Sequence, residues 1–141
     1  MLLTGCQTAR SWPAIDAAQP GWRVREGQAV WTPKARSQAI AGEILLGTGP
    51  AGECLVQFSK TPFPLVTARR DTDAWQIEFG AGARRIGGLG SAPARWVWFQ
   101  LPSAGRGEPL SSPWQCEPAA DGGSRLANSR TGEKLEVWWT P

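Results

Sequence analysis

A series of short segments in which apolar and polar residues alternate constrains the fold of this chain most strongly. The alternation is clearest where Trp75, Ile77 and Phe79 are separated by polar residues. A period of two is typical of a strand with one buried face. Turn-forming clusters such as Gly-Thr-Gly-Pro-Ala-Gly at residues 47–52 separate the segments. We therefore expect strands of an antiparallel sheet at residues 28–33, 37–47, 53–59, 65–70, 75–79, 83–87, 114–117, 125–129 and 134–140.

One segment between these strands, residues 91–101, has the pattern of a helix. Ser91 is a favourable N-cap, and Trp96 and Phe99 recur at helical spacing. Pro102 and Gly105 are expected to end the helix. A sheet with one apolar face must bury that face against another element, and this helix is the obvious cover. The sequence therefore predicts an α+β fold, in which one main helix covers a curved antiparallel sheet.

A chain of 141 residues is long enough for one domain with a real core. We place this domain at residues 28–141, after a tether at residues 1–27. Period-two alternation and helical spacing assign one set of apolar side chains to the inward face: Ile44, Leu46, Val56, Phe58, Leu65, Trp75, Ile77, Phe79, Trp96 and Phe99. The same faces suit a filled core and a hollow cavity equally well.

The N-terminal sequence Leu3-Thr4-Gly5-Cys6 resembles the lipobox of bacterial lipoproteins. In that family the Cys thiol is acylated and the chain is cut just before it, so the resemblance implies lipidation at Cys6 and an address in the cell envelope. Gln7 is not the Asp that retains some lipoproteins in the inner membrane, and we expect the outer membrane, facing the periplasm. The residues before Cys6 are too few for a secretory signal, so we expect a leader upstream of Met1. The alternative is a chance tetrapeptide.

Cys54 and Cys116 remain once Cys6 is assigned to the lipid. In an oxidising compartment an even remainder suggests one disulfide. The alternative is two buried free thiols. Because Cys54 shares a strand face with Val56 and Phe58, we expect it to be buried in either case.

The composition argues against several classes of function. The net charge is only +3, and the arginines are scattered in a way that suits a solvated surface better than a nucleic-acid interface; anionic lipid headgroups would be a weak partner. These arginines are Arg23, Arg25, Arg69, Arg70, Arg84, Arg85 and Arg95. The chain has no His, the usual general base and the commonest metal ligand. Gly-Gly-Leu-Gly at residues 87–90 is interpreted as a helix-entry turn. We expect no catalysis, no metal and no cofactor.

The order of elements resembles the LolA/LolB-like lipoprotein carriers and receptors of the bacterial envelope. The resemblance rests on the lipobox, on Trp75-Gln-Ile-Glu-Phe79, on the segment Ala92–Leu101 and on the Trp-bearing closing strands, and covers about residues 28–139. It implies an incomplete, strongly curved antiparallel barrel with helices over an apolar cavity for lipoprotein acyl chains. Receptors of this family engage the membrane through an exposed Leu on a protruding loop, and Leu89, flanked by glycines, is the nearest match here.

The resemblance implies a membrane-anchored envelope lipoprotein that binds lipid or lipoprotein acyl chains and takes part in lipoprotein localisation. Its partners would be the membrane, through the N-terminal lipid, and an acyl-chain or lipoprotein ligand; the oligomeric state stays open. The nine tryptophans support an alternative, a non-enzymatic module that stacks glycans or docks another envelope protein through exposed Trp98 or Trp138. Trp138 and Trp139 are neighbours on a strand, so one of them must face away from the core.

Overall fold

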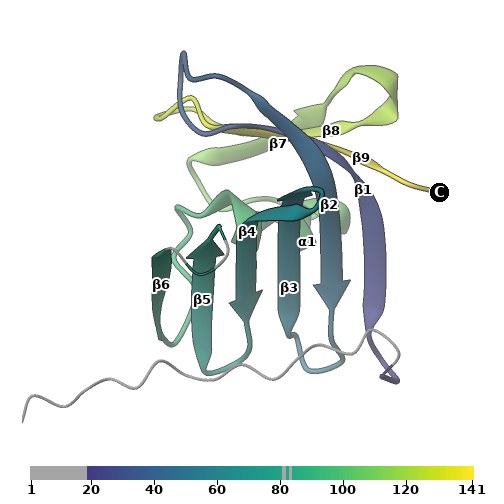
Figure 1. Ribbon diagram of the computed structural model, residues 1–141, viewed down its shortest axis with the longest axis vertical. Coiled ribbons are helices and arrows are strands. Elements are labelled where there is room, and N and C mark those ends of the chain that lie inside the picture. The colour runs from purple at the N-terminus through teal and green to yellow at the C-terminus, as the bar shows by residue number, and fades with distance from the viewer. Residues whose placement is uncertain (1–18, 81, 83) are drawn as a thin grey trace, which may run out of the picture.

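The structure, a computed structural model, describes residues 19–80, 82 and 84–141. The lipobox, with Cys6, lies outside these residues. The described chain forms one antiparallel sheet of nine strands in the order β6-β5-β4-β3-β2-β1-β9-β8-β7 (Figure 1). The strands are β1 (Arg23–Thr32), β2 (Ile40–Thr48), β3 (Cys54–Lys60), β4 (Phe63–Arg70), β5 (Ala74–Phe79), β6 (Arg84–Leu89), β7 (Trp114–Pro118), β8 (Ser124–Asn128) and β9 (Lys134–Trp139). One α-helix, α1 (Val97–Gly105), and a single 3-10 turn, η1 (Ala120–Gly122), complete it.

Strand β1 joins the two parts of the sheet. Its residues pair with β2 on one side and, from Gly27 onward, with β9 on the other. The first six strands follow one another as neighbours, and β7, β8 and β9 return to the side of β1. The sheet stays open, because β6 and β7 are its two edges. The expected curved antiparallel sheet with one helix is thus confirmed.

Gly27 allows β1 to lie close to β9. Its Cα is opposite Ile44 of β2 and Trp139 of β9. A Cβ atom at this position would collide with the backbone carbonyl oxygen of Trp138. Glycine in a strand interior often marks such a close backbone approach. A larger residue at this position would therefore push β1 and β9 apart.

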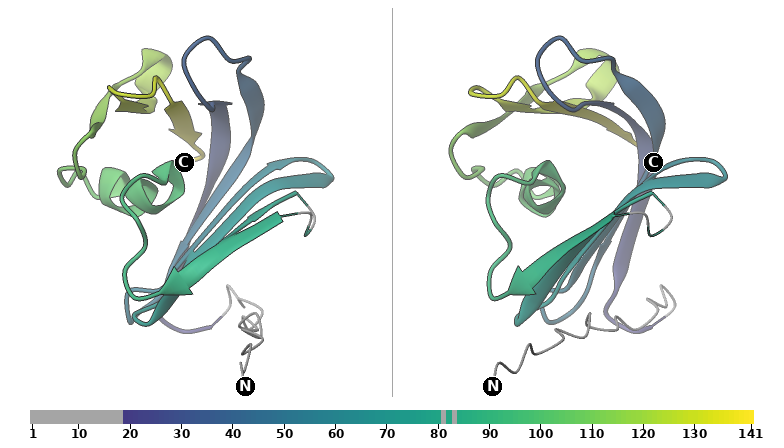
Figure 2. Two further views of the ribbon diagram at one scale, coloured as in Figure 1. Left: turned by 90° about the vertical axis from the view of Figure 1, so that its left-hand side faces the viewer. Right: turned by 60° about the vertical axis from the view of Figure 1, so that its left-hand side comes forward.

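Helix α1 lies inside the curve of the sheet (Figure 2). It contacts β2 and β3 on one side and β7 and β8 on the other. Six consecutive residues, from Val97 to Pro102, are buried. A helix that is apolar nearly all round is buried all round. We call the inner side of the sheet the concave face; its buried residues are Ala29, Ile44, Leu46, Cys54, Val56, Phe58, Val66, Ala68, Trp75, Ile77, Leu126, Leu135 and Val137.

The predicted helix bounds of residues 91–101 are wrong. Pro102 lies inside α1 and does not end it. The helix ends instead in a Schellman motif, in which Gly107 has a φ of +69° and donates its N–H to the carbonyl of Ala104 at 3.1 Å. The N–H of Glu108 reaches the carbonyl of Ser103 at 3.0 Å. The segment before α1 forms turns, because Pro93 and the extended Trp96 delay the first helical residue to Val97.

The predicted boundary between tether and domain is also displaced. Strand β1 begins at Arg23, so residues 23–27 belong to the sheet. Of the expected inward set, Ile44, Leu46, Val56, Phe58, Trp75, Ile77 and Phe99 are buried. Trp96, Phe79 and Leu65 are partly buried against this core.

Leu65 was expected at an inward position, but Val66 and Ala68 take those positions on β4. The register pairs Val66 with Phe58 and Ala68 with Val56. The pairing steps from Phe58–Val66 to Ser59–Pro64, so Leu65 is the extra residue of a bulge in β4 and changes the alternation of this strand. The inward face of β4 is therefore one residue out of phase with the prediction.

Candidate functional site

An aromatic cluster fills the centre of the concave face. The ring of Trp98 on α1 stacks on Phe58 with 5.7 Å between centroids, and meets Trp31 edge-on at 5.0 Å. Trp98 is only 1% exposed. The indole N–H of Trp31 donates to a carboxylate oxygen of Glu133 at 2.8 Å, and burial raises the pKa of this carboxyl. Side chains of α1 therefore occupy the space that the resemblance assigns to acyl chains.

Trp96 lies at the entry to α1, toward the other end of the concave face. Its ring is 6.2 Å from that of Phe79, and the guanidinium of Arg95 lies 4.7 Å above it. The buried Nε1 atom of Trp96 has no hydrogen-bond acceptor among the described residues. A buried donor without an acceptor costs about 1–3 kcal/mol, so an acceptor brought here by a ligand would be stabilised.

Arginines gather at the opposite end of the concave face. Arg23, Arg70 and Arg106 line a pocket of about 410 Å³, which we call the arginine pocket. Cys54 and Pro102 also line it, so the pocket adjoins the core. The arginines that the sequence shows as scattered are thus brought together by β1, β4 and the end of α1.

Arg25 lies near this group. Its guanidinium carbon is 4.6 Å from the ring centroid of Trp139. The pairing of Gly27 with Trp139 explains why Trp139 faces inward, since Gly27 and Ala29 share the concave side of β1. The expectation that only one of Trp138 and Trp139 faces the core is confirmed.

The predicted disulfide between Cys54 and Cys116 is wrong, because both thiols are free. Cys54 is on β3 and Cys116 on the edge strand β7, with β2, β1, β9 and β8 between them. Cys54 is buried as expected, whereas Cys116 is exposed. Burial raises the pKa of the Cys54 thiol to about 11, although Arg70 and Arg106 act in the opposite direction. The Cys54 thiol is therefore neutral at physiological pH.

Two large apolar side chains are strongly exposed. Leu89, the expected membrane contact, is 88% exposed at the end of edge strand β6 rather than on a protruding loop. Phe63, which sequence reasoning missed, is 68% exposed at the start of β4, next to the β3–β4 turn. The prolines on either side of Phe63 were the available signal, since they limit how far this turn can pair.

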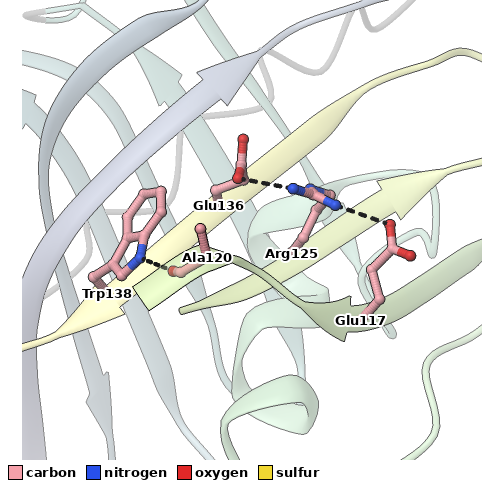
Figure 3. Close-up of polar contacts among 5 residues, drawn as sticks. All are labelled: Glu117, Ala120, Arg125, Glu136 and Trp138. Carbon is pink, nitrogen blue, oxygen red and sulfur yellow. Dashed lines mark hydrogen bonds and ion pairs between the residues drawn. The ribbon is translucent and has the colours of Figure 1, made fainter. Parts of the chain in front are cut away.

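The tryptophans proposed as stacking platforms are engaged within the fold. Trp98 is in the core, so its expected exposure is wrong. The indole N–H of Trp138 donates to the carbonyl of Ala120 at 2.8 Å (Figure 3). The ring also packs against Gly123. Trp138 is therefore fixed by η1 on the outer face of the sheet.

The charged side chains near Trp138 form a cross-strand ion triad. Arg125 of β8 is opposite Glu117 of β7 and Glu136 of β9. Its two Nη atoms lie 3.5 Å and 3.3 Å from the respective carboxylate oxygens (Figure 3). Opposite charges directly across a sheet stabilise the pairing. These carboxylates have a structural role in the terminal strands.

Among the described residues, no group of three or more His, Cys, Asp or Glu is placed to bind a metal ion. No helix in that part of the chain is long and apolar enough to cross a membrane. No protein-family model matches the chain, and a search of curated proteins returned no match.

Proposed function

We propose that this chain is a membrane-anchored lipoprotein of the bacterial envelope that binds the acyl chains of lipids or lipoproteins between its sheet and α1. It would act in lipoprotein localisation, in the manner of the LolA/LolB-like carriers and receptors. The observation that carries the proposal is the concave face, which is apolar across β1 to β5 and is covered there by one nine-residue helix.

The proposal requires α1 to move away from the sheet. Trp98 occupies the centre of the concave face, so an acyl chain and the Trp98 ring compete for the same contacts with Phe58 and Trp31. Removing this ring should therefore favour the ligand. An apolar cavity opened in a core stays dry and binds apolar molecules.

Binding is tested with a fluorescent fatty acid displaced by unlabelled palmitate. The wild type should bind the probe at micromolar concentration, and Trp98→Ala should bind it more tightly. Trp138→Ala is the matched control, because it removes the same side chain from the outer face of the sheet and should leave affinity unchanged. Absence of displaceable binding in the wild type would overturn the proposal.

The anchor is tested separately. With an upstream leader supplied, Cys6→Ser should move the protein from the membrane fraction to the soluble fraction, because one acylated Cys carries the proposed attachment. Equal membrane association of wild type and variant would contradict lipidation at Cys6. This outcome would leave the acyl-binding test unaffected.

A further inference from the structure

The arginine pocket receives one arginine from each of three elements. Arg23 begins β1, Arg70 ends β4, and Arg106 is the C-cap of α1. The register explains why the first two face inward. Arg23 is opposite Thr48, Thr48 is opposite Cys54, and Cys54 is opposite Arg70.

Cross-strand neighbours project from the same face of a sheet. Because Cys54 is buried in the core, the whole row faces the concave side. Three strand spacings put the Cα atoms of Arg23 and Arg70 about 14 Å apart along the row. The two guanidinium groups therefore flank Cys54 from opposite sides, at the edge of the core.

The acidic groups around the pocket do not neutralise these two arginines. Arg106 is paired with Glu108, with Nε–Oε1 and Nη2–Oε2 distances of 2.6 and 3.2 Å. Glu53, which also lines the pocket, accepts the backbone N–H of Ala51 at 2.9 Å. Within the part of the chain that the structure describes, Arg23 and Arg70 have no carboxylate at ion-pair distance.

The neutral thiol of Cys54 adds no negative charge to the pocket at physiological pH. The two residues between the strand arginines in the row, Thr48 and Cys54, are therefore uncharged, although the lining of the pocket also includes the carboxylate of Glu53. A guanidinium is planar and presents donors that match the oxygen atoms of a phosphate in pairs. An arriving anion would meet two such groups without displacing a carboxylate from either.

The geometry points to a binding site for a phosphate group between Arg23 and Arg70, with Arg106 at its rim. Cys54 and Pro102 join the pocket to the core, so a chain attached to the bound phosphate can continue along the concave face. The inference deepens the proposed function and rests on it for the acyl part. It assigns to the ligand an anionic phosphate headgroup.

The test compares three ligands by calorimetry on the full chain, each below its micellar concentration. Glycerol 3-phosphate carries the phosphate alone, monoacylglycerol carries the chain alone, and lysophosphatidic acid carries both. Lysophosphatidic acid should bind most tightly. Arg23→Gln and Arg70→Gln should each weaken its binding about five- to tenfold and leave monoacylglycerol binding unchanged.

Arg130→Gln is the matched control, since it removes the same charge from an exposed residue of the β8–β9 turn. Lys134, which follows this turn, pairs with Thr32 at the end of β1 opposite to Arg23. The affinity of this variant for lysophosphatidic acid should stay within about twofold of the wild-type affinity, because salt screening weakens the influence of a distant exposed charge. Arg70→Lys should bind less tightly than wild type, since it keeps the charge but loses the paired donors.

The outcomes separate the headgroup from the chain. In one outcome, glycerol 3-phosphate and lysophosphatidic acid bind equally, their binding depends on the arginines, and monoacylglycerol does not bind. This outcome supports the phosphate site and contradicts the acyl function. Equal binding of lysophosphatidic acid and monoacylglycerol, unchanged by Arg70→Gln, overturns the phosphate site and leaves the acyl function standing. If a variant does not fold, binding of lysophosphatidic acid and glycerol 3-phosphate to the wild type is measured at increasing salt concentration instead. If the phosphate adds no affinity, or if salt does not weaken its contribution, the phosphate site is overturned.

Discussion

Replacing Trp98 by Ala should cause a large loss of stability with a calculable size. A fully buried aromatic side chain removes about 150–250 Å² from water, and about 25 cal/mol per Å² gives roughly 4–6 kcal/mol. The unfolded chain already buries part of this area, so the estimate is an upper one. Measured Trp→Ala losses in cores are about 3–5 kcal/mol, which is the expected range here. The stacked and edge-on contacts with Phe58 and Trp31 favour its upper half.

The loss is measured by urea unfolding, with a thermal scan as the second readout. A change of this size should lower the melting temperature by on the order of 10 °C. Trp138→Ala, on the outer face, loses one hydrogen bond and partial burial, and should cost only about 1–2 kcal/mol. If Trp98→Ala costs no more than Trp138→Ala, the ring does not fill the concave face and the packing argument fails. Added palmitate should stabilise Trp98→Ala more than the wild type, because the variant is expected to bind palmitate more tightly in the folded state.

Three further perturbations test other parts of the fold. In denaturant unfolding, Gly27→Ala should lower the free energy of unfolding by about 1–3 kcal/mol, because the new Cβ meets a backbone carbonyl. Gly47→Ala should leave it nearly unchanged, because its Cβ would lie 3.5 Å from a Trp22 ring carbon. Equal losses in the two variants would contradict this. Glu133→Gln should raise stability at pH 7, and the gain should vanish in acid. Burial raises the folded-state pKa above the unfolded-state pKa, so the carboxyl increasingly destabilises the fold as pH rises from the unfolded-state value through the folded-state value. A pH-independent difference would refute this assignment. Iodoacetamide should alkylate Cys116 in the folded protein and Cys54 only after unfolding, and peptide mass spectrometry identifies the labelled residue. Labelling of Cys54 in the folded protein would contradict its burial.

The sheet was predictable because its strands are strongly periodic. Trp75, Ile77 and Phe79 alternate with polar residues and do face inward, so local periodicity identified this face correctly. Strand β4 shows the limit of that reasoning. A bulge between Phe58 and Ser59 changes which residue of β4 meets the core, and it arises from pairing between strands rather than from the sequence of β4 itself.

The helix was predicted to exist but was placed too early. Its N-terminal signal at Ser91 is local, whereas the true start at Val97 depends on burying Trp98 against β3. The helix ends at Gly105, one of the two expected stop residues, and Gly107 closes it with a positive φ, whereas Pro102 lies inside the helix. Propensity fixes the approximate position of a short helix, and tertiary packing selects the residues that it contains.

The arginine pocket could not be recognised before the strand register was known. Arg23 and Arg70 are distant in the sequence and become members of one row only through β2 and β3. The same limit applies to the cysteines. Their even number suggested a bond, but the sheet order separates Cys54 from Cys116 by several strands. Residue counts carry no information on which strands become neighbours.

Helix α1 covers the concave face without much helical stability of its own. An isolated helix shorter than about 12–15 residues is marginal in water, and α1 has nine residues, no side-chain N-cap bond and an internal proline, Pro102. Its hold on β2 and β3 is therefore mainly apolar burial, which depends on area and not on direction. An acyl chain that covers the same side chains recovers much of the burial lost when α1 leaves them.

The polar contacts of α1 lie on its other side. In the described part of the chain, Gln100 donates to the carbonyl of Ala94 at 3.1 Å and accepts the N–H of Ser111 at 3.2 Å. The indole N–H of Trp114, on β7, donates to the same Ala94 carbonyl at 2.8 Å. These bonds fasten α1 and its flanking loops to β7. Under the proposed function α1 would therefore separate from β1 to β5 while staying attached to β7, and the opening would include the wall of the arginine pocket formed by Arg23 and Arg70.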